Sequence, residues 1–197
     1  MKKDLLNLLD TVQEHGEELP QSERYLLIDG LNLFFRNFSA INAVNSNGVH
    51  IGGLEDDSKI NQIVRIIQYL KTLPVKTVSL PTVEADDIIA YLSSTLPTKP
   101  EDRVFIVSSD KDYLQLISDK VIVYRPIEKE YYTTDTVKEK FNITPHNFLL
   151  YKLLMGDNSD GVTGIKGLGA KGLFKRFPEL ATQDLSFDDL INLAETK

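Results

Sequence analysis

The sequence of 197 residues contains no cysteine, no tryptophan and only three histidines. Without cysteine the chain can form neither disulfides nor a thiolate zinc site, which suits a reducing cytoplasm. His15, His50 and His146 lie far apart in the sequence, which argues against a histidine metal site or a catalytic triad. Any metal chemistry in this chain must therefore use oxygen ligands.

Long apolar runs are absent as well. No stretch reaches the roughly 20 apolar residues that span a bilayer, so no membrane partner is expected. Near the start of the chain, Leu5, Leu8, Leu9 and Val12 fall on one helical face and are accompanied by acidic residues. We therefore predict an amphipathic helix over 1–22 rather than a signal peptide. Its apolar face is expected to cover the sheet or the helical region, with docking to a replication partner as the alternative.

Strand-like and helical patterns alternate over residues 23–135. Short apolar runs typical of strands occupy 24–30, 75–81 and 102–110. Helical spacing of apolar residues covers 58–73 and 84–96. This alternation predicts an α/β core with a mostly parallel central sheet flanked by helices.

Two further patterns complete the expected architecture. The segments 120–126 and 129–135 predict a closing hairpin with its turn near Pro126–Glu128. Over 136–197 the pattern is helical, and 144–157 is its longest segment. We therefore predict a C-terminal helical region that follows the α/β core.

Acidic residues follow each of the three predicted strands. Asp29 follows the first, Glu84, Asp86 and Asp87 follow the second, and Asp110 and Asp112 follow the third. Each group alone is typical of a turn or of a helix N-terminus. Open parallel sheets bind ligands outside the carboxyl ends of their strands, so three such groups in succession favour a common site.

A fourth acidic pair, Asp157 and Asp160, directly precedes the glycine-rich segment 161–172. Glycines let backbone N–H groups approach a phosphate closely, and nearby cations add charge for the same anion. The cations here are Lys166, Lys171, Lys175 and Arg176. A flexible linker is the alternative interpretation, but Ile165, Leu168 and Leu173 at helical-hairpin spacing indicate packed structure.

Clustered carboxylates stay ionised together only when a cation neutralises them. With oxygen ligands alone, Mg²⁺ or Mn²⁺ is the expected partner. Mg²⁺ usually takes only one or two protein carboxylates, so eight acids indicate two ions. Net charge does not argue against a nucleic-acid partner, because setting these eight aside from the 29 acidic residues leaves 21 against 22 basic ones.

Four motifs occur in an order and spacing that resemble the 5′-nuclease family: LLIDGLNLFFR, VEADDIIAYL, VSSDKDYLQLI and LLMGDNSDGVTGIKGLGAKG. This family includes flap endonucleases, phage exonucleases of the ribonuclease H type and the 5′-nuclease domains of bacterial DNA polymerases. The resemblance implies a PIN-like 5′-nuclease fold, with a helix–three-turn–helix motif in the C-terminal region.

The resemblance also implies roles for individual residues. The metal ligands would be Asp29, Glu84, Asp86, Asp87, Asp110, Asp112, Asp157 and Asp160. Asp29, Asp110 and Lys152 would act in catalysis, with Lys152 near the scissile phosphate. DNA phosphates would contact Gly164, Lys166, Gly167, Gly169, Lys171, Lys175 and Arg176. The carbonyls of Val162 and Ile165 would hold a K⁺ ion.

The implied reaction is Mg²⁺-dependent hydrolysis of a phosphodiester near a 5′ end or flap junction. The expected partner is DNA with duplex and 5′ single-stranded character, and an RNA–DNA hybrid is the alternative. A monomer in the cytoplasm of a bacterial or phage-infected cell is expected.

One part of the family pattern is missing near residues 54–58. There the family has a strand that ends in an aspartate, followed by a helical arch that clamps the 5′ strand. Either the arch has been deleted, or a segment of a longer protein is absent from this sequence. We predict metal and duplex binding with reduced activity. A non-catalytic junction-binding protein and a compact ribonuclease like the PIN-domain toxins are the alternatives.

Overall fold

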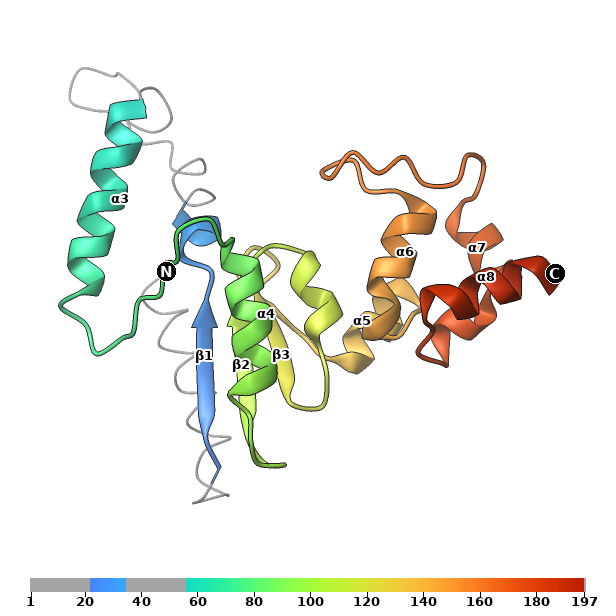
Figure 1. Ribbon diagram of the computed structural model, residues 1–197, viewed down its shortest axis with the longest axis horizontal. Coiled ribbons are helices and arrows are strands. Elements are labelled where there is room, and N and C mark those ends of the chain that lie inside the picture. The colour runs from blue at the N-terminus through green and yellow to red at the C-terminus, as the bar shows by residue number, and fades with distance from the viewer. Residues whose placement is uncertain (1–21, 35–55, 197) are drawn as a thin grey trace.

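The computed structural model describes residues 22–34 and 56–196 (Figure 1). The predicted N-terminal helix lies, apart from its last residue, outside this range. The described chain forms an α/β part around a four-stranded sheet and a C-terminal part made of short helices.

The sheet has the strand order β1-β2-β3-β4. Its strands are β1 (Arg24–Ile28), β2 (Arg103–Val107), β3 (Val121–Arg125) and β4 (Glu130–Tyr132). The first three are parallel, and β4 pairs antiparallel with β3. This confirms the mostly parallel sheet and the closing hairpin, whose turn covers residues 126–129.

The predicted strand over 75–81 is wrong. Residues 75–80 have no regular structure, and Val75, Val78 and Leu80 are about half exposed. A strand needs a neighbour to complete its hydrogen-bond ladder. Within the described residues β1 pairs only with β2, and no strand joins its other edge. The apolar composition of this segment therefore does not make it a strand.

Both helices that the periodicity predicts in the α/β part are present. Helix α3 (Asp56–Leu70) lies beyond β1, and α4 (Ala85–Thr95) lies over one face of the sheet (Figure 1). Helix α4 buries Ile89 and Ser93. By contrast, Ile60, Val64 and Ile67 of α3 remain exposed. The periodicity therefore identified both helices, although only α4 is packed as an amphipathic helix normally is.

The C-terminal region is helical, as predicted. It contains α5 (Thr134–Phe141), η2 (Pro145–Asn147), α6 (Phe148–Met155), α7 (Ala170–Arg176), η3 (Pro178–Ala181) and α8 (Phe187–Thr196). A further short 3-10 helix, η1 (Asp112–Leu116), follows β2 and contacts α6. This contact brings the end of the sheet to the C-terminal region.

One continuous apolar core joins the two parts. Val104 and Ile106 of β2 belong to the same buried cluster as Leu114 of η1, Leu173 of α7 and Leu180 of η3. A group of aromatic rings holds α6 against α5 and α7, with Phe141 edge-on to Phe148 at 5.4 Å and Tyr151 stacked on Phe174 at 6.5 Å. The position of α6, and of the side chains it carries, is therefore set by packing on two sides.

Asn147 is a fully buried polar side chain in this core. Its amide nitrogen donates to the carbonyls of Leu180 and Gln183, at 2.8 and 2.6 Å. Its amide oxygen accepts the backbone N–H of Leu185 at 2.9 Å. The side chain thus supplies backbone partners to the segment between η3 and α8, which would otherwise be buried without them.

Asn147→Ala is expected to lower the free energy of unfolding by about 2–3 kcal/mol, because it leaves buried backbone groups without partners. Urea unfolding followed by circular dichroism measures the effect. Asn192→Ala is the matched control, since Asn192 is exposed on α8. Equal stability of the two variants would contradict the role given to Asn147.

Candidate metal centre

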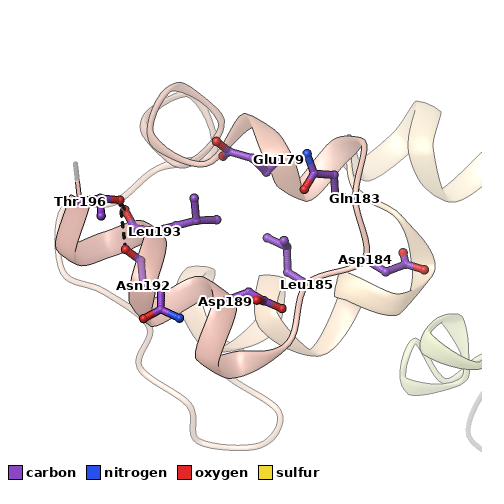
Figure 2. A pocket seen from close by; sticks show the side chains of 8 residues that line it. All are labelled: Glu179, Gln183, Asp184, Leu185, Asp189, Asn192, Leu193 and Thr196. Carbon is purple, nitrogen blue, oxygen red and sulfur yellow. Dashed lines mark hydrogen bonds between the residues drawn. The ribbon is translucent and has the colours of Figure 1, made fainter.

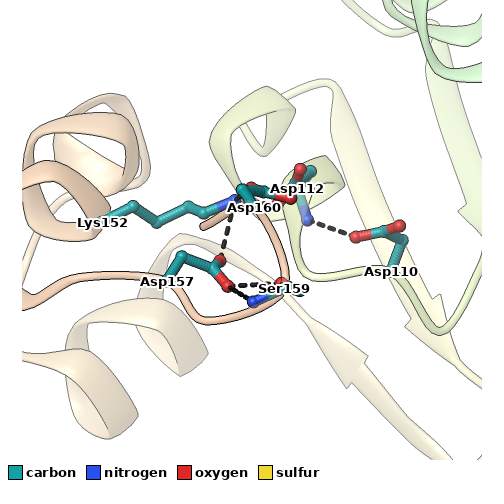
Figure 3. Close-up of polar contacts among 6 residues, drawn as sticks. All are labelled: Asp110, Asp112, Lys152, Asp157, Ser159 and Asp160. Atoms are coloured by element: carbon teal, nitrogen blue, oxygen red, sulfur yellow. Dashed lines mark hydrogen bonds and ion pairs between the residues drawn. The ribbon is translucent and has the colours of Figure 1, made fainter. Parts of the chain in front are cut away.

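Three carboxylates from separate parts of the chain meet beside α6. Asp112 begins η1 just after β2, whereas Asp157 and Asp160 follow α6. One carboxylate oxygen from each lies within 4.8 Å of the others (Figure 3). The structure therefore brings together acids from the third and fourth acidic groups of the sequence.

A tight loop places Asp157 and Asp160 on the same side. The backbone N–H of Asp157 donates to the carbonyl of Val162 at 2.8 Å, and the reverse bond is 2.9 Å long. Within this turn, the backbone N–H of Ser159 donates to the Asp157 carboxylate at 2.9 Å. A turned backbone rather than a helix therefore brings the two aspartates together.

Two glycines let this loop close. Gly156 ends α6 with φ of +88°, and Gly164 has φ of +63°. A Cβ on Gly164 would lie 2.5 Å from the backbone nitrogen of Gly156. No side chain fits there, so the contact between the two backbones requires glycine at this position.

Lys152 lies at the centre of the three carboxylates. Its Nζ is 2.6 Å from Asp112, 2.9 Å from Asp157 and 2.6 Å from Asp160. Burial alone would lower the pKa of the Lys152 ammonium, but its bonds to these carboxylates outweigh that effect and raise the pKa above its ordinary value. The Ser159 hydroxyl, followed by Lys152, holds the pKa of the Asp157 carboxyl well below its usual range. The cluster therefore carries its own counter-cation.

Asp29 lies in a second acidic region at the end of β1. It is 7% exposed and accepts the Tyr113 hydroxyl at 2.9 Å and the backbone N–H of Asn32 at 3.0 Å. Burial, and then the charge of Asp29, raises the pKa of Tyr113 far above its ordinary value. Tyr113 therefore stays protonated and serves as a fixed hydrogen-bond donor to Asp29.

Asp110 links the two acidic regions. Its carboxylate accepts the backbone N–H of Asp112 at 3.0 Å. The charges of Asp86 and Asp110 both contribute to the raised pKa of Tyr113, so these acids lie near the same ring as Asp29. Of these three acids, Asp29 alone accepts the Tyr113 hydroxyl, while Asp86 and Asp110 act on Tyr113 through their charge.

The remaining predicted metal ligands are placed differently. Glu84 and Asp87 are exposed at the start of α4, which here follows an irregular segment rather than a strand. Among the described residues, neither belongs to the group of carboxylates around Lys152. Their role as metal ligands stays a prediction.

Sequence reasoning missed Tyr113, Asn32 and Ser108 as supports of this region. The Asn32 side chain accepts the backbone N–H of Ser109 at 3.2 Å, and the Ser108 hydroxyl accepts that of Asp110 at 3.1 Å. The only signal for Tyr113 was its place directly after Asp112. The contact of Asn32 with Ser109 depends on the pairing of β1 with β2, so no local pattern could indicate it. The contact of Ser108 with Asp110 is local, at a separation of two residues.

The donor set fits a hard divalent cation. All ligand atoms around Lys152 are carboxylate oxygens, which Mg²⁺ and Mn²⁺ prefer in proteins. Mg²⁺ binds oxygen at about 2.0–2.1 Å, so these carboxylates must move inward or bind through water. A second ion near Asp29 and Asp110 stays a prediction.

The glycine-rich segment exposes its basic side chains beside this cluster. Lys166 lies in the same turn as Gly167, whose φ is +80°. Gly169 precedes α7, and Lys171 lies in its first turn. Lys175 and Arg176, also exposed, lie in the last turn of α7. This exposure suits phosphate contact, and the DNA-binding role of these residues stays a prediction.

The predicted K⁺ ligands already make backbone bonds. The carbonyl of Val162 accepts from Asp157, and that of Ile165 accepts the N–H of Leu168 at 3.0 Å. Each carbonyl keeps one further lone pair for a cation. The K⁺ site therefore stays a prediction.

A cavity of about 410 Å³ lies elsewhere, between η3 and α8 (Figure 2). Its polar lining includes Glu179, Asp184 and Asp189. Such a lining repels phosphate, so this cavity does not extend a nucleic-acid surface.

No helix among the described residues is long and apolar enough to cross a membrane.

Comparison with known proteins finds similarity to 5′-3′ exonucleases. The family model for the N-terminal resolvase-like domain of 5′-3′ exonuclease matches residues 55–142. The chain is 42% identical over 110 residues to a 5′-3′ exonuclease of Aquifex aeolicus, which covers 56% of this chain and 38% of the relative. It is 32% identical over 185 residues to a 5′-3′ exonuclease of Buchnera aphidicola, which covers 89% of this chain and 61% of the relative. The chain is thus similar to 5′-3′ exonucleases, as the resemblance to the 5′-nuclease family implies.

The fold agrees with this family. A variant of the bacteriophage T5 flap endonuclease, solved in a complex with DNA and metal ions, superposes with a TM-score of 0.67. The match covers 86% of this chain and 78% of that one at 20% identity, which establishes the shared PIN-like fold. Our chain spans less than two thirds of the length of the two curated 5′-nucleases named above.

Gly164→Ala is expected to disrupt the loop that carries Asp157 and Asp160, at a cost of about 3 kcal/mol or more in unfolding free energy. Gly161→Ala is the matched control. Gly161 also has positive φ, of +69°, but a Cβ there meets nothing within 4 Å. Gly161→Ala should lower the unfolding free energy only by the cost of placing alanine at positive φ, about 1–2 kcal/mol. Urea unfolding measures both, and equal losses would mean that the close approach of the two backbones is unimportant.

Proposed function

We propose that this chain is a metal-dependent 5′-nuclease that hydrolyses DNA phosphodiesters near a 5′ end or flap junction. The observation that carries the proposal is the meeting of Asp112, Asp157 and Asp160 within 4.8 Å. Asp157 and Asp160 lie in one loop, and Asp112 meets them from a distant segment of the chain. Bringing like charges together costs electrostatic energy, so a contribution to fold stability does not explain the cluster. A cation-dependent activity gives a reason for keeping these acids together.

Relatives and structural neighbours support the same activity. The relatives from Aquifex and Buchnera are named 5′-3′ exonucleases, and the phage T5 neighbour is a flap endonuclease. That neighbour was solved with DNA and metal ions, which supports DNA as the substrate class and a metal cofactor. Mg²⁺ or Mn²⁺ is the proposed metal, with two ions acting together.

The residues would divide the work as follows. Bound divalent ions would supply Lewis-acid stabilisation of the phosphodiester and activation of a water molecule. The carboxylates around Lys152 would hold one ion, while Asp29, fixed by Tyr113, and Asp110 would support the other. Lys152 would offer its ammonium to a phosphate oxygen, where it stabilises developing negative charge.

The glycine-rich segment would hold the duplex beside this centre. Its exposed lysines and glycines offer charge and backbone N–H groups to successive phosphates. Because phosphate contacts position DNA without reading its sequence, we propose recognition of structure rather than of sequence. A K⁺ ion at the carbonyls of Val162 and Ile165 would add positive charge to this phosphate-binding segment.

The absence of an arch motif near residues 54–58 bears on the rate. Without arch cations, the 5′ strand is positioned less well, and positioning contributes many-fold to catalysis. We therefore propose reduced cleavage and weakened flap selectivity. A monomer in the cytoplasm of a bacterial or phage-infected cell completes the proposal, with an RNA–DNA hybrid as a second substrate.

A non-catalytic junction-binding protein is the second candidate. The ion pairs of Lys152 favour it, because they neutralise much of the acidic charge without any metal. Under this alternative the acids would be structural, and DNA binding would depend on the glycine-rich segment alone.

Cleavage of a labelled 5′-flap substrate, with and without Mg²⁺, tests the proposal. Asp112→Asn should lower the rate about 100-fold or more, since even residues behind a metal ligand commonly contribute 10–100-fold. Asp119→Asn is the matched control, because Asp119 is exposed outside the site. Both variants should bind flap DNA like the unmodified chain in a gel-shift assay in Ca²⁺.

The outcomes separate the two candidates. Mg²⁺-dependent cleavage that Asp112→Asn abolishes supports the nuclease. Tight junction binding without any cleavage supports the binding protein. Cleavage as fast and as flap-selective as that of a relative with an arch would contradict the proposed loss of selectivity.

A further inference from the structure

The ammonium of Lys152 occupies the place where a divalent ion would bind. An ammonium has three N–H donors and no acceptor, and Lys152 directs its Nζ at three carboxylates, 2.6 to 2.9 Å away. The ligand oxygens lie within 4.8 Å of one another, which leaves room for one cation among them. We infer that Lys152 is a built-in counter-cation that competes with the divalent metal for this site and must leave it when the metal binds.

Electrostatics supports exclusion rather than sharing. An ammonium and a divalent ion bound by the same three oxygens would lie only a few ångströms apart and repel strongly. The preferred distances differ too, because Mg²⁺ needs oxygens at about 2.0–2.1 Å. The carboxylates are therefore spaced for the ammonium, and they must close inward or take up water once the metal replaces it.

The competition leaves the site attractive to metal. The three carboxylates carry three negative charges, of which Lys152 neutralises one. The site thus stays anionic while the close repulsion among its carboxylates is relieved. The acids can in this way remain assembled before any metal arrives.

The ammonium of Lys152 can leave the site without any movement of the α6 backbone. The backbone of α6 is fixed by the rings of Phe148 and Tyr151, which pack with Phe141 and Phe174. The lysine side chain is 14% exposed, and its flexible four-carbon stem lets the ammonium swing away from the carboxylates. Metal binding would thereby release a cation beside the site, free to meet a phosphate oxygen.

This inference rests on the proposed function and gives Lys152 a second role within it. Lys152 is a competitor of the metal before substrate binds, and a phosphate ligand only after the metal has displaced it. Metal and phosphate binding are thus coupled: metal frees the ammonium, and a phosphate that captures the ammonium favours metal binding.

Mn²⁺ binding measured by electron paramagnetic resonance and by isothermal titration calorimetry tests the competition without any nuclease assay. Lys152→Met should bind Mn²⁺ about tenfold more tightly at the cluster, within the usual 5–150-fold range of coupling between sites. Without metal, Lys152→Met should also melt at a lower temperature, because the three carboxylates then lose their counter-cation.

Lys111→Met is the matched control for general charge. Lys111 is exposed and directly precedes Asp112, but it makes no ion pair with the three carboxylates. Removing this more distant, solvated charge should alter Mn²⁺ affinity by roughly twofold at most in 0.15 M salt. An equal gain in Mn²⁺ affinity in both variants would overturn the inference of direct competition. An unchanged or weaker Mn²⁺ affinity in Lys152→Met would overturn it too.

A measurement on the unmodified chain covers the case in which Lys152→Met fails to fold. NMR of the lysine ¹⁵Nζ groups should show a protected ammonium signal without metal, assigned by its loss in Lys152→Gln. Saturating Mg²⁺ should remove the protection. A signal that stays protected at saturation would overturn the inference.

The results also separate this inference from the proposed nuclease. Competition without cleavage would sustain the role of Lys152 and remove the catalytic proposal. Metal-dependent cleavage without competition would sustain the nuclease proposal and overturn the role given to Lys152. No Mn²⁺ binding by any variant would overturn both.

Discussion

Mutual repulsion among closely placed carboxylates is the constraint on which the functional region depends. Asp112, Asp157 and Asp160 are held within 4.8 Å, and only a positive charge at their centre makes that arrangement stable. Lys152 supplies that charge in the structure. The same constraint explains why the cluster suits metal ions, because a site that needs one cation for stability attracts another of higher charge.

Packing elsewhere in the chain fixes the parts that meet there. The aromatic contacts of α6 set the base of Lys152, and the contact of Gly156 with Gly164 sets the loop of the two aspartates. Asn147 ties the segment before α8 to the start of α6. The candidate metal centre therefore lies on well-packed elements, whereas α3 and the irregular segment after it expose much of their apolar surface.

Much of the fold was readable from the sequence because its signals are local. Periodicity identified α3 and α4, and turn residues marked the hairpin of β3 and β4. The strand predicted over 75–81 failed for a non-local reason: a strand exists only where a neighbour pairs with it. Apolar composition reports a tendency toward burial and carries no information about whether that neighbour is present.

The sequence by itself determined the chemistry of this protein. Without cysteine, and with few histidines, it restricted metal ligands to oxygen, and its motifs indicated the family and which acids belong to it. Tertiary structure alone decided the grouping: Asp112 joins Asp157 around Lys152, while Asp29 joins Tyr113. The physical reason is that ligand identity is a property of residue type, whereas contact depends on the loop closure and packing that bring distant segments together.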